Sequence, residues 1–401
     1  MHTPRIRWFP LTLALVALAA SLDGGTRSRA RGQEPTDKEA PTKQAAEARD
    51  EARRPRLRVI NGTASAVEIF WLKSPEERVP SGVLEPGKDT VITTTLGHRF
   101  AVVRRAGGAE EVVTSEVPVQ AFRVGGLPAI YTQQASAEGF LVVASERVNP
   151  FALKEAVYIV NQLLAQRPDV RAAMIKSGAR LSIMAHDEFT TDLPEWAWLA
   201  DEPAPGFEEI SARDYRDARA RGMGGSLTDP YCSCAEENLL AYDGDPYAAE
   251  NILIHELAHN IHLRGMSNVD PTFDGRVRGA WDAAMSAGLW KGKYAAVNHH
   301  EYFAEGVQSW FDDNRENDHD HNHVNTRAEL LEYDPRLAAL CREVFGETEF
   351  RYTKPTTRLT GHLAGYDPTK APRFEFPPRL AAARKQIRAA AQARNAKANG
   401  E

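Results

Sequence analysis

The sequence of 401 residues predicts a multidomain protein in which a small all-β sandwich is followed by an α+β, mainly helical domain. Three observations support this prediction. Residues 57–125 hold short runs of β-branched and aromatic residues separated by turn signals. Residues 140–378 instead carry apolar residues mostly at helical spacing. The chain between the first twenty residues and residue 57 has almost no large apolar side chain, so it cannot contribute to either core.

Residues 1–19 have the layout of a cleaved secretory signal. Two arginines precede an apolar run from Leu11 to Ala20, and Ala17 and Ala19 form the small-residue pattern that suits signal peptidase. The run is short for a membrane span, and a retained anchor is the alternative. No other segment is long and apolar enough to cross a membrane. We therefore expect no membrane span after cleavage and a secreted or otherwise extracytoplasmic location, in the periplasm or at the cell surface.

Residues 20–56 are mostly Arg, Glu, Lys, Ala, Pro, Thr and Gln. Such a segment cannot bury enough apolar surface to offset the entropy of ordering, so we expect a disordered linker. Residues 379–401 are rich in Ala, Arg and Lys and are expected to form a frayed helix or a basic tail. The net charge of −6 gives no reason to propose a nucleic-acid partner.

The chain has three cysteines, Cys232, Cys234 and Cys341, so at most one intramolecular disulfide can form. One residue separates the first two, which disfavours a bond between them. A link from either of them to Cys341 would suit an exported protein, and the sequence leaves the pairing open.

Five strands are expected in the amino-terminal sandwich, and turn signals separate them. Asn61-Gly62, Glu85-Pro-Gly87 and Gly107-Gly108 are sequences that favour tight turns. We expect the strands to form a small antiparallel sandwich. They are expected at Leu57–Ile60, Ala66–Leu72, Thr90–Thr93, His98–Val103 and Glu111–Val113.

The second domain is expected to begin with a helix over residues 149–168, because Asn149 is a suitable N-cap and Pro150 suits the first helical position. A short helix near residues 169–176 and a strand at residues 180–185 follow. The glycine-rich loop that begins at residues 222–225 leads toward the next helix. It is either a simple connector or a wall of a cleft.

The most informative motif is His255-Glu-Leu-Ala-His259, which matches the pattern H-E-x-x-H inside a helical run. Residues four apart lie on one face of a helix, so both imidazoles can reach a single metal ion. Glu256 can then take a proton from a water that the metal activates. Leu253 and Leu257 mark a second face that packs into a core. The pattern predicts a zinc hydrolase, and an amphipathic helix with histidines on its solvent side is the alternative.

A catalytic zinc ion needs a third protein ligand and an open position for water. His262 lies only three residues past His259 on the same helix, so a residue from another element is the better candidate. Glu301 and Glu305 are four residues apart on a second expected helix. We expect Glu301 to bind the metal and Glu305 to accept a hydrogen bond from a ligand histidine. One Zn²⁺ per chain is therefore expected.

Together the two helices resemble the gluzincin zinc peptidases, most closely the catalytic domain of anthrax lethal factor and its relatives. That family has H-E-x-x-H on one helix, E-F-F-A-E on the next, and a tyrosine seven residues before the ligand glutamate. This chain has Glu301-Tyr-Phe-Ala-Glu305 and a tyrosine at Tyr294. The resemblance covers roughly residues 150–340.

The resemblance implies a zincin-like fold and hydrolysis of amide bonds in a protein or peptide substrate. It implies that His255, His259 and Glu301 bind zinc and that Glu256 is the general base. Tyr294 would donate a hydrogen bond to the oxyanion or protonate the leaving amine. The recognition domains that select the lethal factor's substrate have no counterpart here, so its substrate is not implied.

The amino-terminal module resembles the β domain of the von Hippel–Lindau tumour suppressor. Ile69-Phe-Trp-Leu72, Leu84-Glu-Pro-Gly87 and Gly97-His98 match landmarks of that domain. In that family the module holds a peptide that contains hydroxyproline. The matching pocket positions of this chain are Trp71, Thr94, His98 and Phe100.

Ser81 stands where that family has a tyrosine, and Phe100 replaces a tryptophan. The resemblance therefore implies a groove for an extended peptide rather than recognition of hydroxyproline. The alternative is that Trp71 and Phe100 are core residues and that His98 is an ordinary turn residue.

Residues 312–323 are dense in acids and histidines. They could bind a second metal, either calcium on oxygen ligands or zinc on His319, His321 and His323. The alternative is a polar loop that follows the Glu301 helix and borders the cleft. Helices are expected to resume over residues 325–335 and 336–345.

The sequence as a whole predicts an exported zinc metallopeptidase with a β module that binds a peptide or protein. One alternative is a secreted binding protein whose zinc site is structural. Another is a zinc hydrolase of a non-peptide amide, because the same activated water serves both reactions.

Overall fold

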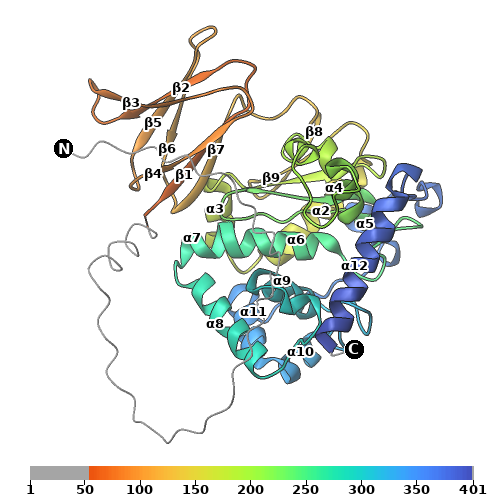
Figure 1. Ribbon diagram of the computed structural model, residues 1–401. Helices are drawn as coiled ribbons and strands as arrows, with labels where there is room; N and C mark the ends of the chain where they lie inside the picture. The colour runs from red at the N-terminus through yellow and green to blue at the C-terminus, as the bar shows by residue number, and fades with distance from the viewer. Residues whose placement is uncertain (1–53, 400–401) are drawn as a thin grey trace, which may run out of the picture.

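The computed structural model describes residues 54–399, with a β-rich amino-terminal region followed by a helical region (Figure 1). The strands of the first region, coloured red to orange, lie together at one end of the molecule, and helices coloured green to blue form most of the rest. The expected signal sequence, residues 1–19, lies outside the described residues. So does nearly all of the expected linker, residues 20–56.

The amino-terminal region consists of two sheets, one with the strand order β4-β1-β7 and the other with the order β3-β2-β5-β6. Leu57 and Val59 of the first sheet share one buried cluster with Ile69 and Val102 of the second, so the core lies between the sheets. The strands are β1 (Arg56–Asn61), β2 (Val67–Leu72), β3 (Arg78–Leu84), β4 (Asp89–Thr93), β5 (Arg99–Arg104), β6 (Glu110–Thr114) and β7 (Val119–Val124).

Two of these strands, β3 and β7, are missing from the sequence-based prediction. β3 contains Pro80 and Gly82, which weaken a strand signal. The strand tolerates both because it lies at a sheet edge and its pairing with β2 shifts between Ile69 and Phe70. The expectation of purely antiparallel pairing is wrong for one pair, because β7 runs parallel to β1. All four strands of the other sheet separate the two in sequence, so local patterns cannot reveal their pairing.

The helical region holds a four-stranded sheet with the order β11-β10-β9-β8. Its strands are β8 (Gln133–Ala137), β9 (Phe140–Ala144), β10 (Arg180–Met184) and β11 (Tyr231–Ala235). β9, β10 and β11 run parallel, and β8 is antiparallel to β9. β10 is the strand expected from the sequence, and it lies inside the sheet. β11 was not expected because Tyr-Cys-Ser-Cys-Ala mixes small and polar residues, although all five are buried.

The helix expected at residues 149–168 is confirmed as α2, which ends earlier, at Leu163. The Asn149 side chain accepts a hydrogen bond from Phe151 N (3.0 Å), and Pro150 opens the helix. The helices are α2 (Pro150–Leu163), α3 (Pro168–Lys176), α4 (Ala212–Arg219), α5 (Glu236–Leu239), α6 (Ile252–Asn260), α7 (Ser267–Val269), α8 (Phe273–Ser286), α9 (His299–Trp310), α10 (Arg327–Tyr333), α11 (Pro335–Phe345) and α12 (Ala381–Asn399).

The β-rich amino-terminal region contacts the helical region through the outer edge of β7. The Asn268 side chain accepts a hydrogen bond from Val119 N (2.7 Å) and donates one to Val119 O (3.0 Å). Ala121 N donates to Ser177 O (3.0 Å), at the end of α3. These bonds use backbone groups that an edge strand would otherwise expose, so the helical region covers this edge of the sandwich.

The segment expected to be a frayed helix or tail forms α12, and its start is attached to the helical region. Arg379 binds the carboxylates of Asp214 and Asp217 on α4, and Leu380 and Ala383 are buried. Within residues 54–399, no helix combines the length and the apolar character that a membrane span requires.

All three cysteines, Cys232, Cys234 and Cys341, are buried free thiols. The disulfide that the sequence left open is therefore not formed in this structure.

We predict that Gly178→Ala destabilises the contact between the two regions. Gly178 has φ +79°, and a Cβ there would lie 2.4 Å from Ala121 O on β7. Gly126 also has a positive φ (+71°) but has no atom within 4 Å of a Cβ, so Gly126→Ala is the matched control. The control should cost about 1–2 kcal/mol of unfolding free energy from backbone strain. Gly178→Ala should cost about 1–3 kcal/mol more because of the overlap.

Urea unfolding of the two variants and the wild type measures this difference. Equal unfolding midpoints for Gly178→Ala and Gly126→Ala would show that the close approach to Ala121 contributes nothing to stability.

Candidate metal centre

Helix α6 carries the H-E-x-x-H motif, and its ends and faces follow from its sequence. Asn251 caps it by accepting a hydrogen bond from Ile254 N (3.3 Å). Leu253 and Leu257 are fully buried in the main core of the helical region. The motif lies on the side of α6 that faces α9, and a π-helical turn, Ile261–Met266, follows the helix directly. A π-helical turn at this place is typical of functional sites.

Helix α9 brings the third expected ligand. Asn298 caps it by accepting hydrogen bonds from His300 N (2.8 Å) and Glu301 N (3.0 Å). Tyr302 and Phe303 are fully buried, so the helix is fixed in rotation about its axis. Glu301, the residue before them, points toward α6.

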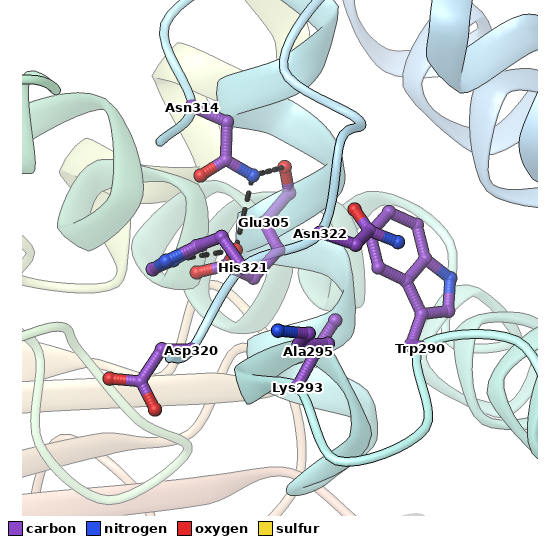
Figure 2. Close-up of a pocket in the computed structure, with 8 residues that line it drawn as sticks. All are labelled: Trp290, Lys293, Ala295, Glu305, Asn314, Asp320, His321 and Asn322. Carbon is purple, nitrogen blue, oxygen red and sulfur yellow. Dashed lines mark hydrogen bonds and ion pairs between the residues drawn. The ribbon is translucent and has the colours of Figure 1, made fainter. Parts of the chain in front are cut away.

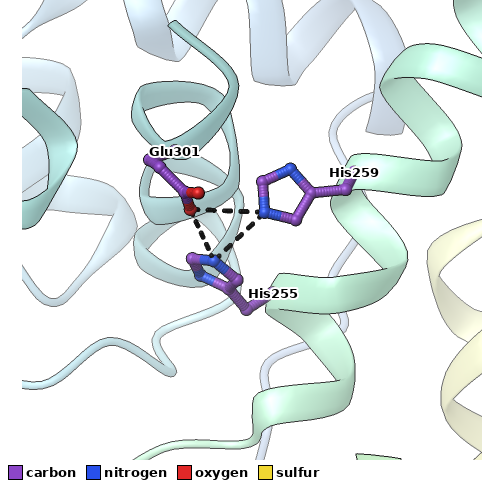
Figure 3. A group of neighbouring side chains, drawn as sticks. All are labelled: His255, His259 and Glu301. Atoms are coloured by element: carbon purple, nitrogen blue, oxygen red, sulfur yellow. Dashed lines mark hydrogen bonds and ion pairs between the residues drawn. The ribbon is translucent and has the colours of Figure 1, made fainter. Parts of the chain in front are cut away.

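The structure brings the three sequence-predicted metal ligands together (Figure 3). Glu301 Oε2 lies 3.1 Å from His255 Nε2 and 3.3 Å from His259 Nε2, and the two histidine nitrogens are 3.3 Å apart. Neighbouring donors around a tetrahedral zinc ion, with bonds of about 2.0–2.1 Å, lie roughly 3.3–3.4 Å apart. The donor set and its spacing therefore fit one zinc ion.

A hydrogen bond that the sequence analysis missed orients His255. His255 Nδ1 lies 2.8 Å from Gln308 Oε1, and Gln308 Nε2 donates to Glu250 Oε2 (2.8 Å). Because the amide nitrogen of Gln308 is committed to Glu250, its oxygen accepts the proton of His255 Nδ1. This leaves the lone pair of Nε2 for a metal. Arg315 pairs with Glu250 in turn (2.9 Å).

Glu305 was expected to accept the hydrogen bond of a ligand histidine, but Gln308 has that position. Glu305 Oε1 lies farther away, 3.6 Å from His255 Nδ1. Gln308 follows Glu301 by seven residues, two helical turns, so the heptad spacing along α9 was a signal that could have revealed it.

Glu305 is held instead by the polar segment 312–323 (Figure 2). His321 Nε2 lies 3.2 Å from Glu305 Oε2, and Asn314 Nδ2 donates to the same oxygen (3.1 Å). Burial opposes the charge of Glu305, yet His321 and Asn314 outweigh it and hold the pKa of this carboxyl below its ordinary value. The carboxylate thus stays ionised behind His255.

The histidines of residues 312–323 do not gather around one point. His321 is buried against Glu305, His319 pairs with Asp320 (2.9 Å), and His323 packs its ring on Tyr333. Neither of the two groups within residues 54–399 that could hold a metal includes any of the three. The segment therefore fits the alternative of a polar loop that borders the site.

Glu256 and Tyr294 lie beside the three candidate metal ligands. Glu256 is buried, and this burial raises the pKa of its carboxyl, partly offset by His255 and His259. The Tyr294 ring centre is 6.1 Å from that of His255, and Asp320 O accepts a hydrogen bond from Tyr294 N (2.8 Å).

Nearby charge keeps the Tyr294 phenol protonated. The Glu301 carboxylate, and then burial, raise the pKa of Tyr294 well above its ordinary value. Its hydroxyl is therefore a hydrogen-bond donor at every physiological pH.

Arg219, the last residue of α4, adds a positive charge that the sequence analysis did not identify. Burial opposes that charge, but Tyr294, Tyr215 and Glu301 raise the pKa of Arg219 above its ordinary value. The Arg219 side chain is nevertheless exposed to solvent. No local pattern marks it, because α4 lies far from α6 and α9 in sequence.

Residues 222–225 extend the sheet of the helical region by a short pairing with its edge strand. Met223 N donates to Ser233 O (3.1 Å) and Ser233 N donates to Met223 O (2.8 Å), in an antiparallel arrangement. The pairing holds the glycine-rich segment between β11 and the motif face of α6.

Contacts with α6 explain the glycines of this segment. A Cβ on Gly222 would lie 2.9 Å from Glu256 Cγ, and one on Gly224 would lie 2.4 Å from His259 Cδ2. Distances this short exclude any side chain unless the motif residues move. Of the two alternatives left open by the sequence, the structure therefore supports a wall of the site.

The expected pocket residues of the sandwich fall into two groups. Trp71 and His98 are half-buried with ring centres 5.0 Å apart, and Thr94 Oγ1 is 3.2 Å from His98 Nδ1. Phe100 is only 3% exposed and belongs to the core, so it cannot line a groove. Its inward position follows from strand alternation along β5.

The centre thus consists of two histidines and a glutamate that can hold a zinc ion, with a buried carboxylate and a protonated tyrosine beside them. No protein-family model matches the chain, and no curated protein matches its sequence.

We predict that Gly224→Ala weakens zinc binding, because the new methyl group would displace the His259 ring from its position beside His255 and Glu301. The loss should be about 10–100-fold in affinity, as for other changes that misorient a ligand. Competition with a chromogenic chelator measures it. Gly279→Ala, on the exposed side of α8 with no atom within 4 Å of its Cβ, is the control and should bind zinc as the wild type does. Unchanged affinity in Gly224→Ala would mean that the segment does not support His259.

Proposed function

We propose that the protein is an exported zinc-dependent peptidase. The observation that supports this proposal most is the convergence of the His255, His259 and Glu301 donor atoms at 3.1–3.3 Å, beside Glu256 and Tyr294. A zinc site that serves only structure needs neither a buried carboxylate nor a protonated tyrosine next to it. Export is proposed from the signal-like pattern of residues 1–19.

Each side chain near the proposed zinc ion has a separate role in the proposed reaction. Zinc, when bound, lowers the pKa of water and polarises the substrate carbonyl. Glu256 accepts a proton from the attacking water at its carboxylate and passes it to the leaving amine. Tyr294 donates a hydrogen bond from its hydroxyl to the carbonyl oxygen as negative charge develops there. Arg219 contributes positive charge that interacts with Tyr294 and Glu301.

We propose that the helical region is a zincin-like catalytic domain of the gluzincin type. The ligand pair on α6, the third ligand on α9 and the sheet whose edge strand β11 lies against α6 support this assignment. The two-sheet amino-terminal region is proposed to be a module similar to the von Hippel–Lindau β domain, on the sequence landmarks near Trp71 and His98.

The central test is Glu256→Gln. We expect the variant to keep the zinc content of the wild type, because Glu256 is not a ligand, and to lose hydrolysis of a diverse peptide library by about 100-fold or more, because the amide cannot accept the proton. Metal analysis and cleavage assays on both proteins measure this. Removal of zinc by a chelator should abolish wild-type cleavage, and added zinc should restore it. Wild-type cleavage rates in Glu256→Gln would overturn the mechanism.

The same experiment separates the alternatives. Zinc in both proteins without peptide cleavage would favour a binding protein with a structural zinc. Cleavage of small amides but of no peptide, with the same loss in Glu256→Gln, would favour a hydrolase of a non-peptide amide.

We further propose that the sandwich binds an extended segment of the protein substrate. Trp71 on β2 and His98 directly before β5 form a half-buried aromatic pair, and Thr94 fixes the His98 ring. An aromatic pair of this kind suits apolar side chains of a peptide.

If so, Trp71→Ala should lower kcat/KM for protein substrates about 10-fold, as expected for loss of one aromatic anchor, and leave cleavage of short peptides unchanged. Val91→Ala, at an exposed position of the other sheet, is the control and should change neither. Equal effects of Trp71→Ala on protein and short-peptide substrates would rule out a separate binding role for the sandwich.

A further inference from the structure

A second cluster of metal-binding side chains lies next to the first on the same helices. Asp274 Oδ1 is 3.0 Å from His299 Nε2, 3.2 Å from His262 Nε2 and 3.5 Å from His300 Nε2. The donor atoms of Asp274, His299 and His300 all lie within 4.8 Å of one another. His262 lies outside this group of three, but its Nε2 is 3.2 Å from the same carboxylate oxygen.

Hydrogen bonding alone does not account for this cluster. A carboxylate oxygen has two lone pairs, so it cannot accept directed hydrogen bonds from three imidazoles at once. The His262 side chain is completely buried, its Nδ1 has no hydrogen-bond partner in residues 54–399, and its Nε2 meets only Asp274 Oδ1, at 3.2 Å and without hydrogen-bond geometry. Buried polar atoms are almost always paired, and an unpaired one calls for a specific explanation such as an ion.

The cluster is buried on the side of His262 and His299, whereas His300 and Asp274 are 35% and 28% exposed. The His262 ring packs against Phe273 and Phe303, with ring centres 5.4 and 5.2 Å away. The rings of His299 and His300 lie 4.0 Å apart, centre to centre.

Arg278 lies at the outer side of the cluster, 3.8 Å from Asp274 Oδ2 and 3.5 Å from His299 Nε2. Its side chain is 59% exposed, so it can turn toward solvent without a packing cost and does not block Oδ1.

We propose that Asp274, His299, His300 and His262 bind a second zinc ion. Three imidazoles and a carboxylate are a donor set that zinc prefers, and four protein ligands leave no open position for water. The second ion is therefore structural, in contrast to the three-ligand centre of His255, His259 and Glu301.

The four proposed ligands come from elements next to the first centre, so the second ion would stabilise the packing of those elements. His262 comes three residues after the ligand His259, in the π-helical turn that follows α6, and His300 directly precedes the ligand Glu301 on α9. Asp274 lies at the start of α8. One ion at this point would join the two helices of the first centre to a third helix. The proposal concerns metal binding only and is independent of what the first centre catalyses.

Metal analysis of the full chain tests the proposal. After loading with Zn²⁺ and dialysis, the wild type should hold about two zinc ions per chain. His255→Ala, which disrupts the first centre, should hold about one, and so should the double variant Asp274→Ala/His300→Ala. His323→Ala removes an exposed histidine outside both clusters and should hold about two. One zinc in the wild type, kept by Asp274→Ala/His300→Ala and lost from His255→Ala, would overturn the proposal.

A second measurement isolates the new site from the first. Metal-free His255→Ala, with its fold checked by circular dichroism, is titrated with Co²⁺, and His259→Ala replaces it if that variant does not fold. We expect the visible absorption of four-coordinate Co²⁺, together with a rise in the thermal unfolding temperature. Both should disappear when Asp274→Ala is added. Absence of Co²⁺ binding to the folded single variant would refute a second site.

Discussion

The packing of α6 against α9 is the constraint on which the rest of the centre depends. It brings two imidazole nitrogens and a carboxylate oxygen from separate helices to within 3.1–3.3 Å of one another. Buried apolar faces hold this arrangement. Leu253 and Leu257 of α6 share one continuous core with Tyr302 and Phe303 of α9. The energy of that core fixes the donor geometry, so the three proposed ligands are preorganised for a metal ion.

Polar side chains behind the ligands add orientation to this packing. Gln308 accepts a hydrogen bond from His255 Nδ1 and is itself held by Glu250. His321 and Asn314 keep the Glu305 carboxylate ionised. The acid- and histidine-rich residues 312–323 thus support the centre from outside. Their composition resembles that of a metal site because supporting a charged centre requires the same residue types as ligating one.

Features that depend on the residues of a single helix could be predicted from the local sequence. The cap at Asn149, the i, i+4 pair His255 and His259, and the buried face of α6 were all predicted and are confirmed. Features that depend on distant segments were not predictable. β7 pairs in parallel with β1 across five intervening strands, and β11 is a strand because it lies between β10 and residues 222–225.

The same limit applies within the site. Arg219 and Gln308 reach the centre through tertiary packing and carry no motif of their own. The position of Phe100 was ambiguous because an aromatic residue on a strand suits a groove and a core equally. Only the pairing of β5 with β2 shows which face it occupies. No sequence pattern marks Asp274, because the three histidines around it come from two other elements.

The pairing of Met223 with Ser233 has a consequence for the choice of substrate. An exposed edge strand can hold an extended chain through its own N–H and C=O groups, which supply affinity, while pockets for side chains supply specificity. Here the protein's own backbone already occupies those groups of Ser233. A polypeptide entering the proposed active site must either be selected through its side chains or exchange places with residues 222–225.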